Sequence, residues 1–318
     1  MGRYRPKHCL KRVPNKVNLE VLYYTPYNRF YYFKVTMSVN QDIVRKFEKF
    51  SLSLSQCAEK EIEKIKLKLT KDLIGYDQSS FALVIMGSLA KREPSINYDR
   101  DSILIFGNDI DENVKSEITK KCISSFDELG IPKCTGGMSI DSEQAVRSLM
   151  GWNEFFGRLT KFPRLKQLIF VDAMRCSVLI VGNPHLFKVH QELVAHCILG
   201  GASTELLLIS SCLMLLSPSK KNIKLILNQI IKYNYIYEPS LLYEMSLPRN
   251  LNFLINQGIL TNDNVSWLKG YYIRYMSHRT MIKLDEEESI SDFFSMLKLR
   301  LIALKVLVRV VGRRIVSS

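Results

Sequence analysis

The sequence predicts an α+β protein in which a small β-sheet flanked by helices comes first and an all-helical bundle follows. An apolar, β-rich run at Ala82–Met86 ends in a glycine-serine turn, which is typical of a buried strand. A second apolar run ends at Phe106 and is closed by Gly107-Asn108. From Pro184 onward the apolar residues recur at helical spacing, with short breaks.

The composition describes a folded protein with room for two domains. The chain has 318 residues, 47% of them hydrophobic and 24% charged, which excludes a disordered chain. The net charge of +14 favours phosphate-rich partners, although a generally lysine-rich surface accounts for it equally well. Seven scattered cysteines without a C-x-x-C pair indicate reduced thiols, and no histidine spacing indicates a zinc site.

Residues 1–40 are predicted to be a basic amino-terminal arm followed by a β-hairpin. The β-branched and aromatic residues of the segment 17–38 lie on both sides of a Pro-Tyr-Asn turn. The basic start lacks the apolar run of a signal peptide, and Pro6 stands where a myristoylation signal needs serine or threonine. We therefore expect a cytoplasmic protein without a membrane partner.

The predicted second domain, residues 41–183, alternates helices with short strands. One long or two consecutive amphipathic helices over 41–73 lead into the strand at Ala82. The later segments are expected to be a helix at 113–129 ended by Gly130, a helix at 141–159 capped by Ser139 or Asp141 with Trp152 in the core, and a strand or strand pair at 168–181 that contains Asp172.

The residues that carry chemistry gather around the first strand and the start of the second. Gly87 lets a backbone approach a phosphate closely, and Ser88 adds a hydroxyl donor. Asp99 and Asp101 alternate with Arg100 as strand residues do, so both carboxylates point to one face. Two such carboxylates suit Mg²⁺, with Mn²⁺ as an alternative, in phosphoryl or nucleotidyl transfer.

Two segments together resemble a known family. The sequence GSLAKRE (87–93) followed by YDRDSILIF (98–106) resembles the DNA polymerase beta-type nucleotidyltransferase superfamily. It is most similar to the nucleotidyltransferases related to the amino-terminal domain of bacterial PII-protein uridylyltransferases. Residues 131–138, Trp152 and the segment 171–175 resemble later parts of the same family. The resemblance implies a small mixed β-sheet and a nucleotidyltransferase of the uridylyl- or adenylyltransferase kind, the latter an ATP-binding enzyme.

The resemblance also implies roles for individual residues. Asp99 and Asp101 would hold the metal ions, and the Gly87 backbone with Ser88 would hold the triphosphate of the nucleotide. Lys91 or Arg92 would neutralise phosphate charge.

A third catalytic and metal-binding carboxylate is expected at Asp172, which would also help to deprotonate the nucleophile. Asp141 is the rival for this role, and Asp172 could instead be a structural partner of Arg175. The family usually places a Gly-Asp soon after its Asp-x-Arg strand, whereas this chain has Gly182-Asn183.

Residues 184–318 are predicted to be a helical substrate-binding domain. The short connections favour antiparallel neighbours in a bundle, and the resemblance makes this bundle the second wall of the substrate cleft. Arg274, His278 and Arg279 could meet phosphates, but an inward-facing Ile273 explains most of the same pattern. The last helix suits a bundle core or a homodimer interface. The helices expected in residues 184–318 are His185–Leu199, Thr204–Leu216, Lys220–Tyr233, Pro239–Gln257, Val265–Ser277 and Ile290–Val311.

Two functions from different classes remain open. The first is a Mg²⁺-dependent enzyme that moves a nucleoside monophosphate from a nucleoside triphosphate to an acceptor hydroxyl and releases pyrophosphate. The acceptor is a protein, an RNA or a small molecule. The second is a non-catalytic module that keeps the fold and binds a nucleotide or RNA through its basic surface.

Overall fold

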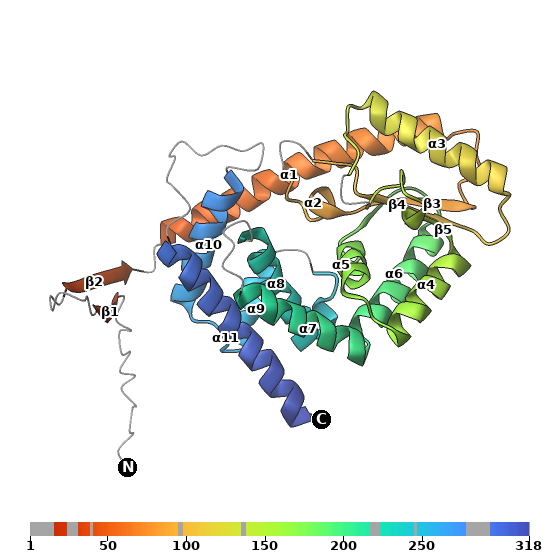
Figure 1. The fold of residues 1–318 in the computed structure, drawn as a ribbon. Coiled ribbons are helices and arrows are strands. Elements are labelled where there is room, and N and C mark those ends of the chain that lie inside the picture. Colours follow the sequence, from red (N-terminus) through yellow and green to blue (C-terminus); the bar gives the residue numbers. More distant parts are fainter. Residues whose placement is uncertain are drawn as a thin grey trace, which may run out of the picture.

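The computed structural model describes residues 16–23, 31–38, 41–94, 98–134, 138–216, 223–244, 247–277 and 293–317 (Figure 1). The expectations for the arm before residue 16 and for His278 and Arg279 lie outside these residues.

The amino-terminal hairpin is confirmed. Strand β1 (Lys16–Tyr23) pairs antiparallel with β2 (Tyr31–Ser38), so that Lys16 lies opposite Ser38. The predicted turn between them falls outside the described residues.

A four-stranded mixed sheet in the order β5-β4-β3-β6 forms the centre of the first half of the chain. Strand β3 (Phe81–Ile85) runs antiparallel to β4 (Ser102–Phe106) and to β6 (Val178–Gly182). The short β5 (Val146–Ser148) runs parallel to β4. All residues of β3 and β4 are buried, because helices cover both faces of a sheet whose central strands are continuously apolar. The predicted α+β class with a small mixed sheet is confirmed.

The two faces of this sheet belong to two hydrophobic clusters. The second half of α1 (Gln41–Asp72) and α3 (Glu112–Glu128) cover one face. The other face packs against α4 (Leu149–Lys161), α5 (Leu165–Met174) and α6 (Pro184–Leu199). In β3 and β4, alternate residues separate cleanly between the clusters, since successive side chains of a strand point to opposite faces.

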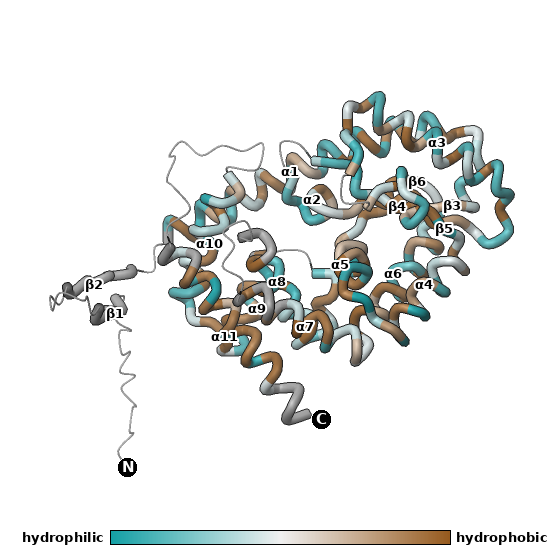
Figure 2. Tube along the Cα trace, in the orientation of Figure 1, coloured by the Kyte–Doolittle hydropathy of each residue, from teal (hydrophilic) through white to brown (hydrophobic). Residues whose placement is uncertain are grey.

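The carboxy-terminal half is helical, as predicted (Figure 1). Figure 2 shows long hydrophobic stretches along α7 and α11. Within the described ranges, no single helix has the length and apolar content to cross a membrane; only the bent pair Pro184–Leu199 and Gly201–Ser210, at 67°, reaches that composition jointly. The elements are α7 (Gly201–Leu216), α8 (Ile223–Tyr237), a 3₁₀ turn at Pro239–Leu241, α9 (Leu247–Asn256), α10 (Asn262–Ser277) and α11 (Phe293–Ser317).

Three expected elements were wrong. The helix expected over Pro239–Gln257 is a 3₁₀ turn at Pro239–Leu241 followed by α9. The segment 168–181 is a helix followed by a strand, α5 and β6, so Asp172 lies on a helix. The expected helix at 141–159 is a 3₁₀ turn (Glu143–Ala145), strand β5 and then α4, because the Ser148 hydroxyl accepts a hydrogen bond from the Gly151 N–H and starts the helix there.

Candidate metal centre

The turn after β3 brings the backbone against an acidic side chain. The Met86 N–H donates to the Asp101 carbonyl at 2.8 Å, which continues the pairing of β3 with the start of β4. Gly87 follows with φ +68°, a conformation that favours glycine. A Cβ at Gly87 would lie 2.1 Å from Asp101 Oδ2. The Asp101 carboxylate can therefore occupy this position only because residue 87 has no side chain. The short helix α2 (Gly87–Ala90) begins at this glycine.

Three ligand groups converge beside this turn. One ligand atom each of Asp99, Asp101 and Cys134 lies within 4.8 Å of the other two. The two aspartates are half-buried and Cys134 is buried. The carboxylates supply the hard oxygens that Mg²⁺ and Mn²⁺ prefer, and the thiol adds a softer third group. The donor set therefore fits a divalent cation.

Cys134 reaches the aspartates through backbone pairing. The Arg100 N–H donates to the Pro132 carbonyl at 3.0 Å, and the Ser102 N–H donates to the Met138 carbonyl at 2.9 Å. These bonds lay the segment around Cys134 alongside the approach to β4. The sequence reasoning missed Cys134, and the only signal was its place in a segment that resembles the family.

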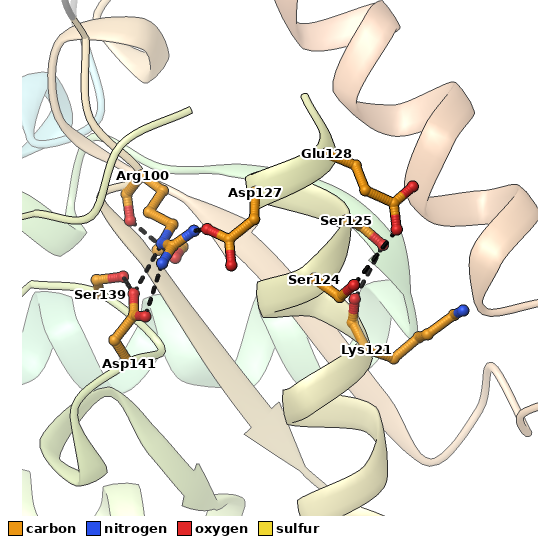
Figure 3. Close-up of polar contacts among 9 residues, drawn as sticks. Arg100, Lys121, Ser124, Ser125, Asp127, Glu128, Ser139 and Asp141 are labelled. Carbon is orange, nitrogen blue, oxygen red and sulfur yellow. Dashed lines mark hydrogen bonds and ion pairs between the residues drawn. The ribbon is translucent and has the colours of Figure 1, made fainter. Parts of the chain in front are cut away.

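Arg100 lies between the two aspartates in the sequence, and its side chain is directed toward Asp127 and Asp141 (Figure 3). Its buried guanidinium donates to both oxygens of Asp141, from Nε at 2.8 Å and from Nη2 at 2.7 Å, and also contacts Asp127. Such forked pairing is the strong form of an ion pair. Asp99 and Asp101 therefore converge with Cys134 whereas Arg100 belongs to a structural ion pair, and all three residues precede β4 rather than lie in it.

Asp141 is committed to this ion pair. Burial alone would raise the pKa of its carboxyl group, but hydrogen bonds from Arg100 and from the Ser139 hydroxyl at 2.5 Å outweigh burial and lower that pKa.

Asp172 lies in a separate network on the helical side. Its Oδ1 accepts from Arg175 Nε at 3.0 Å and from the Tyr235 hydroxyl at 2.7 Å. Its Oδ2 lies 3.3 Å from Lys232 Nζ. Burial would raise the pKa of Asp172, but the charges of Lys232 and Arg175 and the Tyr235 hydrogen bond bring it well below its usual range. In the described part of the chain Asp172 is not among the converging ligand groups, and its role as third carboxylate stays a prediction.

The remaining predicted residues surround α2. Ser88 and Lys91 are half-buried, and Lys91 is near enough to Asp172 for its charge to lower the pKa of that carboxyl group. Arg92 has φ +60°, and its Nη2 lies 2.7 Å from Glu59 Oε1 on α1, so this guanidinium is directed toward α1.

A mixed sheet with paired carboxylates next to a glycine turn forms an α+β domain with a candidate metal site. Residues 37–166 match the family model described as "Putative nucleotidyltransferase DUF294". The match over this segment is consistent with a nucleotidyltransferase-family relationship and supports, at that coarse level, an enzyme of nucleotidyl transfer. The match ends before Asp172 and before the carboxy-terminal helices. No curated protein matches the chain.

Proposed function

We propose that this protein is a metal-dependent nucleotidyltransferase that moves a nucleoside monophosphate from a nucleoside triphosphate to an acceptor hydroxyl and releases pyrophosphate. The observation that carries the proposal is the convergence of Asp99 and Asp101 beside the Gly87 turn, inside the segment that matches the family.

Separate residues of the chain would hold the cation and bind the triphosphate. Asp99 and Asp101, with Cys134 beside them, would hold the cation, and the Gly87 turn keeps the Asp101 carboxylate in place. A bound divalent cation would stabilise negative charge on the transferred group and on the leaving pyrophosphate. The Ser88 hydroxyl and the ammonium of Lys91 would bind the triphosphate.

Lys232 and Tyr235 of α8 contact Asp172 of α5, and the charge of Lys91, the C-cap residue of α2, acts on the same carboxyl group. We propose that the acceptor hydroxyl, on a protein, an RNA or a small molecule, enters between these elements.

Pyrophosphate release from each labelled nucleoside triphosphate tests the proposal. We expect release with Mg²⁺ or Mn²⁺, none in EDTA, and recovery when the metal is restored. Asp99→Asn/Asp101→Asn should lower the rate by more than ~100-fold, because it removes both carboxylates that hold the metal. Asp109→Asn, an exposed aspartate in the turn after β4, is the matched control and should keep the wild-type rate. Equal rates in the double variant and the wild type would refute the metal assignment.

The engagement of both Asp172 oxygens favours a second candidate, a non-catalytic nucleotide- or RNA-binding module. A carboxylate occupied by Arg175, Tyr235 and Lys232 is poorly available to a nucleophile. The module predicts nucleotide or RNA binding without pyrophosphate release, and RNA binding that falls steeply with salt. If release is seen in the wild type and lost in Asp172→Asn, with nucleotide binding unchanged, Asp172 acts in catalysis and the module is excluded.

A further inference from the structure

A pocket outside the metal centre opens between β5, α4 and α5. Its volume is about 440 Å³, within the range of pockets that bind small molecules. Its lining includes Arg147, Arg158, Arg164, Phe155, Phe162 and Gln167.

The pocket carries positive charge without a counter-charge. None of the lining residues that the structure describes is acidic. Among the ion pairs of the described ranges, none involves Arg147, Arg158 or Arg164. Burial and the charge of Arg158 lower the pKa of Arg147, as expected for two guanidiniums that line one pocket. An anion would relieve this repulsion.

Contacts with neighbouring residues hold the Arg147 guanidinium in one orientation. Its guanidinium carbon lies 5.5 Å from the Trp152 ring centroid and 5.3 Å from that of Phe155, and its Nε donates to the Gln144 carbonyl at 3.2 Å. These contacts fix the guanidinium plane. Its terminal amino groups donate to no acceptor in the described segments, and a fixed guanidinium fork matches phosphate oxygens.

The pocket also offers an apolar surface and lies apart from the metal centre. Phe162 is 75% exposed at its edge, so a flat ring could cover it. Arg147 pairs in register with Ile105, whereas Asp101 precedes β4. The two positions are about 13 Å apart along the strand, at ~3.3 Å per residue.

We propose that this pocket binds a small phosphorylated molecule that carries a flat ring, at a site distinct from the metal centre. The phosphate would meet the three arginines, and the ring would pack on Phe162. A pocket of this size holds one such molecule, whereas a strand of RNA would need an open track of positive charge.

Calorimetric titration of the full chain in EDTA tests the proposal without using activity. The probes are 4-nitrophenyl phosphate and adenosine monophosphate, compared with 4-nitrophenol, adenosine and inorganic phosphate. We expect at least one phosphorylated probe to bind at least tenfold more tightly than either of its halves.

Arg158→Gln and Arg164→Gln, at exposed positions, should each weaken binding about tenfold, as for the loss of one charge-assisted hydrogen bond. Lys161→Gln removes an exposed charge from the same helix outside the lining, and it should leave the affinity unchanged. Asp99→Asn/Asp101→Asn should also bind normally, so the outcome is independent of the metal centre.

Three results would overturn the proposal: no binding of either phosphorylated probe, equal losses in the Lys161 and arginine variants, or arginine-dependent binding of a single-stranded RNA with neither probe bound. The last would identify a nucleic-acid surface.

Discussion

Gly87 and Asp101 form one structural unit at the candidate metal centre. The positive φ of Gly87 and the 2.1 Å that would separate a Cβ from Asp101 Oδ2 make two separate demands on position 87. The first demand is a left-handed backbone conformation, which strains a residue that has a side chain by about 1–2 kcal/mol. The second is a clash that must move the carboxylate. A substitution here therefore acts on the metal site as well as on stability.

We expect Gly87→Ala to abolish tight Mn²⁺ binding and to lower the free energy of unfolding by about 1–3 kcal/mol, because strain and clash both apply. Gly130→Ala is the matched control. Gly130 has φ +71° but no atom within 4 Å of a Cβ, so this variant should lose about 1 kcal/mol of stability and keep Mn²⁺ binding. Urea unfolding and Mn²⁺ titration measure both quantities. Normal Mn²⁺ binding in Gly87→Ala would contradict the coupling.

Among the elements, those with strong patterns were predictable and those that depend on local competition were not. The long helix α1 and the buried strands β3 and β4 follow from uninterrupted periodicity or short apolar runs between turns. Helix α5 was misread because its run Leu-Ile-Phe-Val suggests a strand, whereas Leu168, Val171 and Met174 are buried at helical spacing. In this segment, tertiary packing overrode the strand propensity of the individual residues.

The candidate site shows the same division. The pair Asp99 and Asp101 was predictable from its Asp-x-Asp spacing, and the structure brings the two carboxylates together although both residues precede β4. Cys134 was not predictable, because its position depends on hydrogen bonds between segments that are distant in sequence. The surroundings of Asp172 also depend on the packing of helices, because its partners Lys232 and Tyr235 come from α8.

Helix α6 packs on α4 through a buried histidine. The His190 ring lies 5.0 Å from the Trp152 ring and 5.4 Å from the Phe156 ring. Both of its ring nitrogens are buried without a hydrogen-bond partner in the described structure. Burial therefore lowers the pKa of His190 to about 3.

This lowered pKa makes stability depend on pH. Below the ordinary histidine pKa the unfolded chain binds a proton that the folded chain does not, so stability falls as pH decreases from about 6.5 toward about 3. We expect a loss of several kcal/mol over this range, to be measured by urea unfolding at each pH. His190→Phe should show a smaller loss, whereas His185→Gln, at an exposed position, should match the wild type. Parallel pH curves for wild type and His190→Phe would contradict the assignment.

At the scale of the whole molecule, α1 connects the two hydrophobic clusters. Its second half, with Ile62 and Leu69, packs in the cluster that contains α3. Its first half, with Phe47 and Leu54, packs in the cluster that contains the carboxy-terminal helices. The Phe47 ring lies 5.7 Å from the ring of Tyr272 on α10. The predicted domain boundary at 183/184 thus cuts through one shared core.

We expect a fragment of residues 41–183 to lose cooperative unfolding, because removal of the helical half exposes the first half of α1 and takes Lys232 and Tyr235 away from Asp172. The fragment should bind the dye ANS and unfold over a broad range of urea, whereas the full chain unfolds sharply. A sharp transition of the fragment at the midpoint of the full chain would show that the two domains fold independently.

The contact between α1 and α10 also has a consequence for synthesis on the ribosome. Tyr272 is translated ~225 residues after Phe47, which at roughly 5–20 residues per second is a delay of about 10–45 s. During that time the apolar face at the start of α1 has left the ribosome without its final partner. A nascent chain with such a face is a substrate for chaperones that bind hydrophobic segments, and Phe47 and Phe50 are where we expect them to bind.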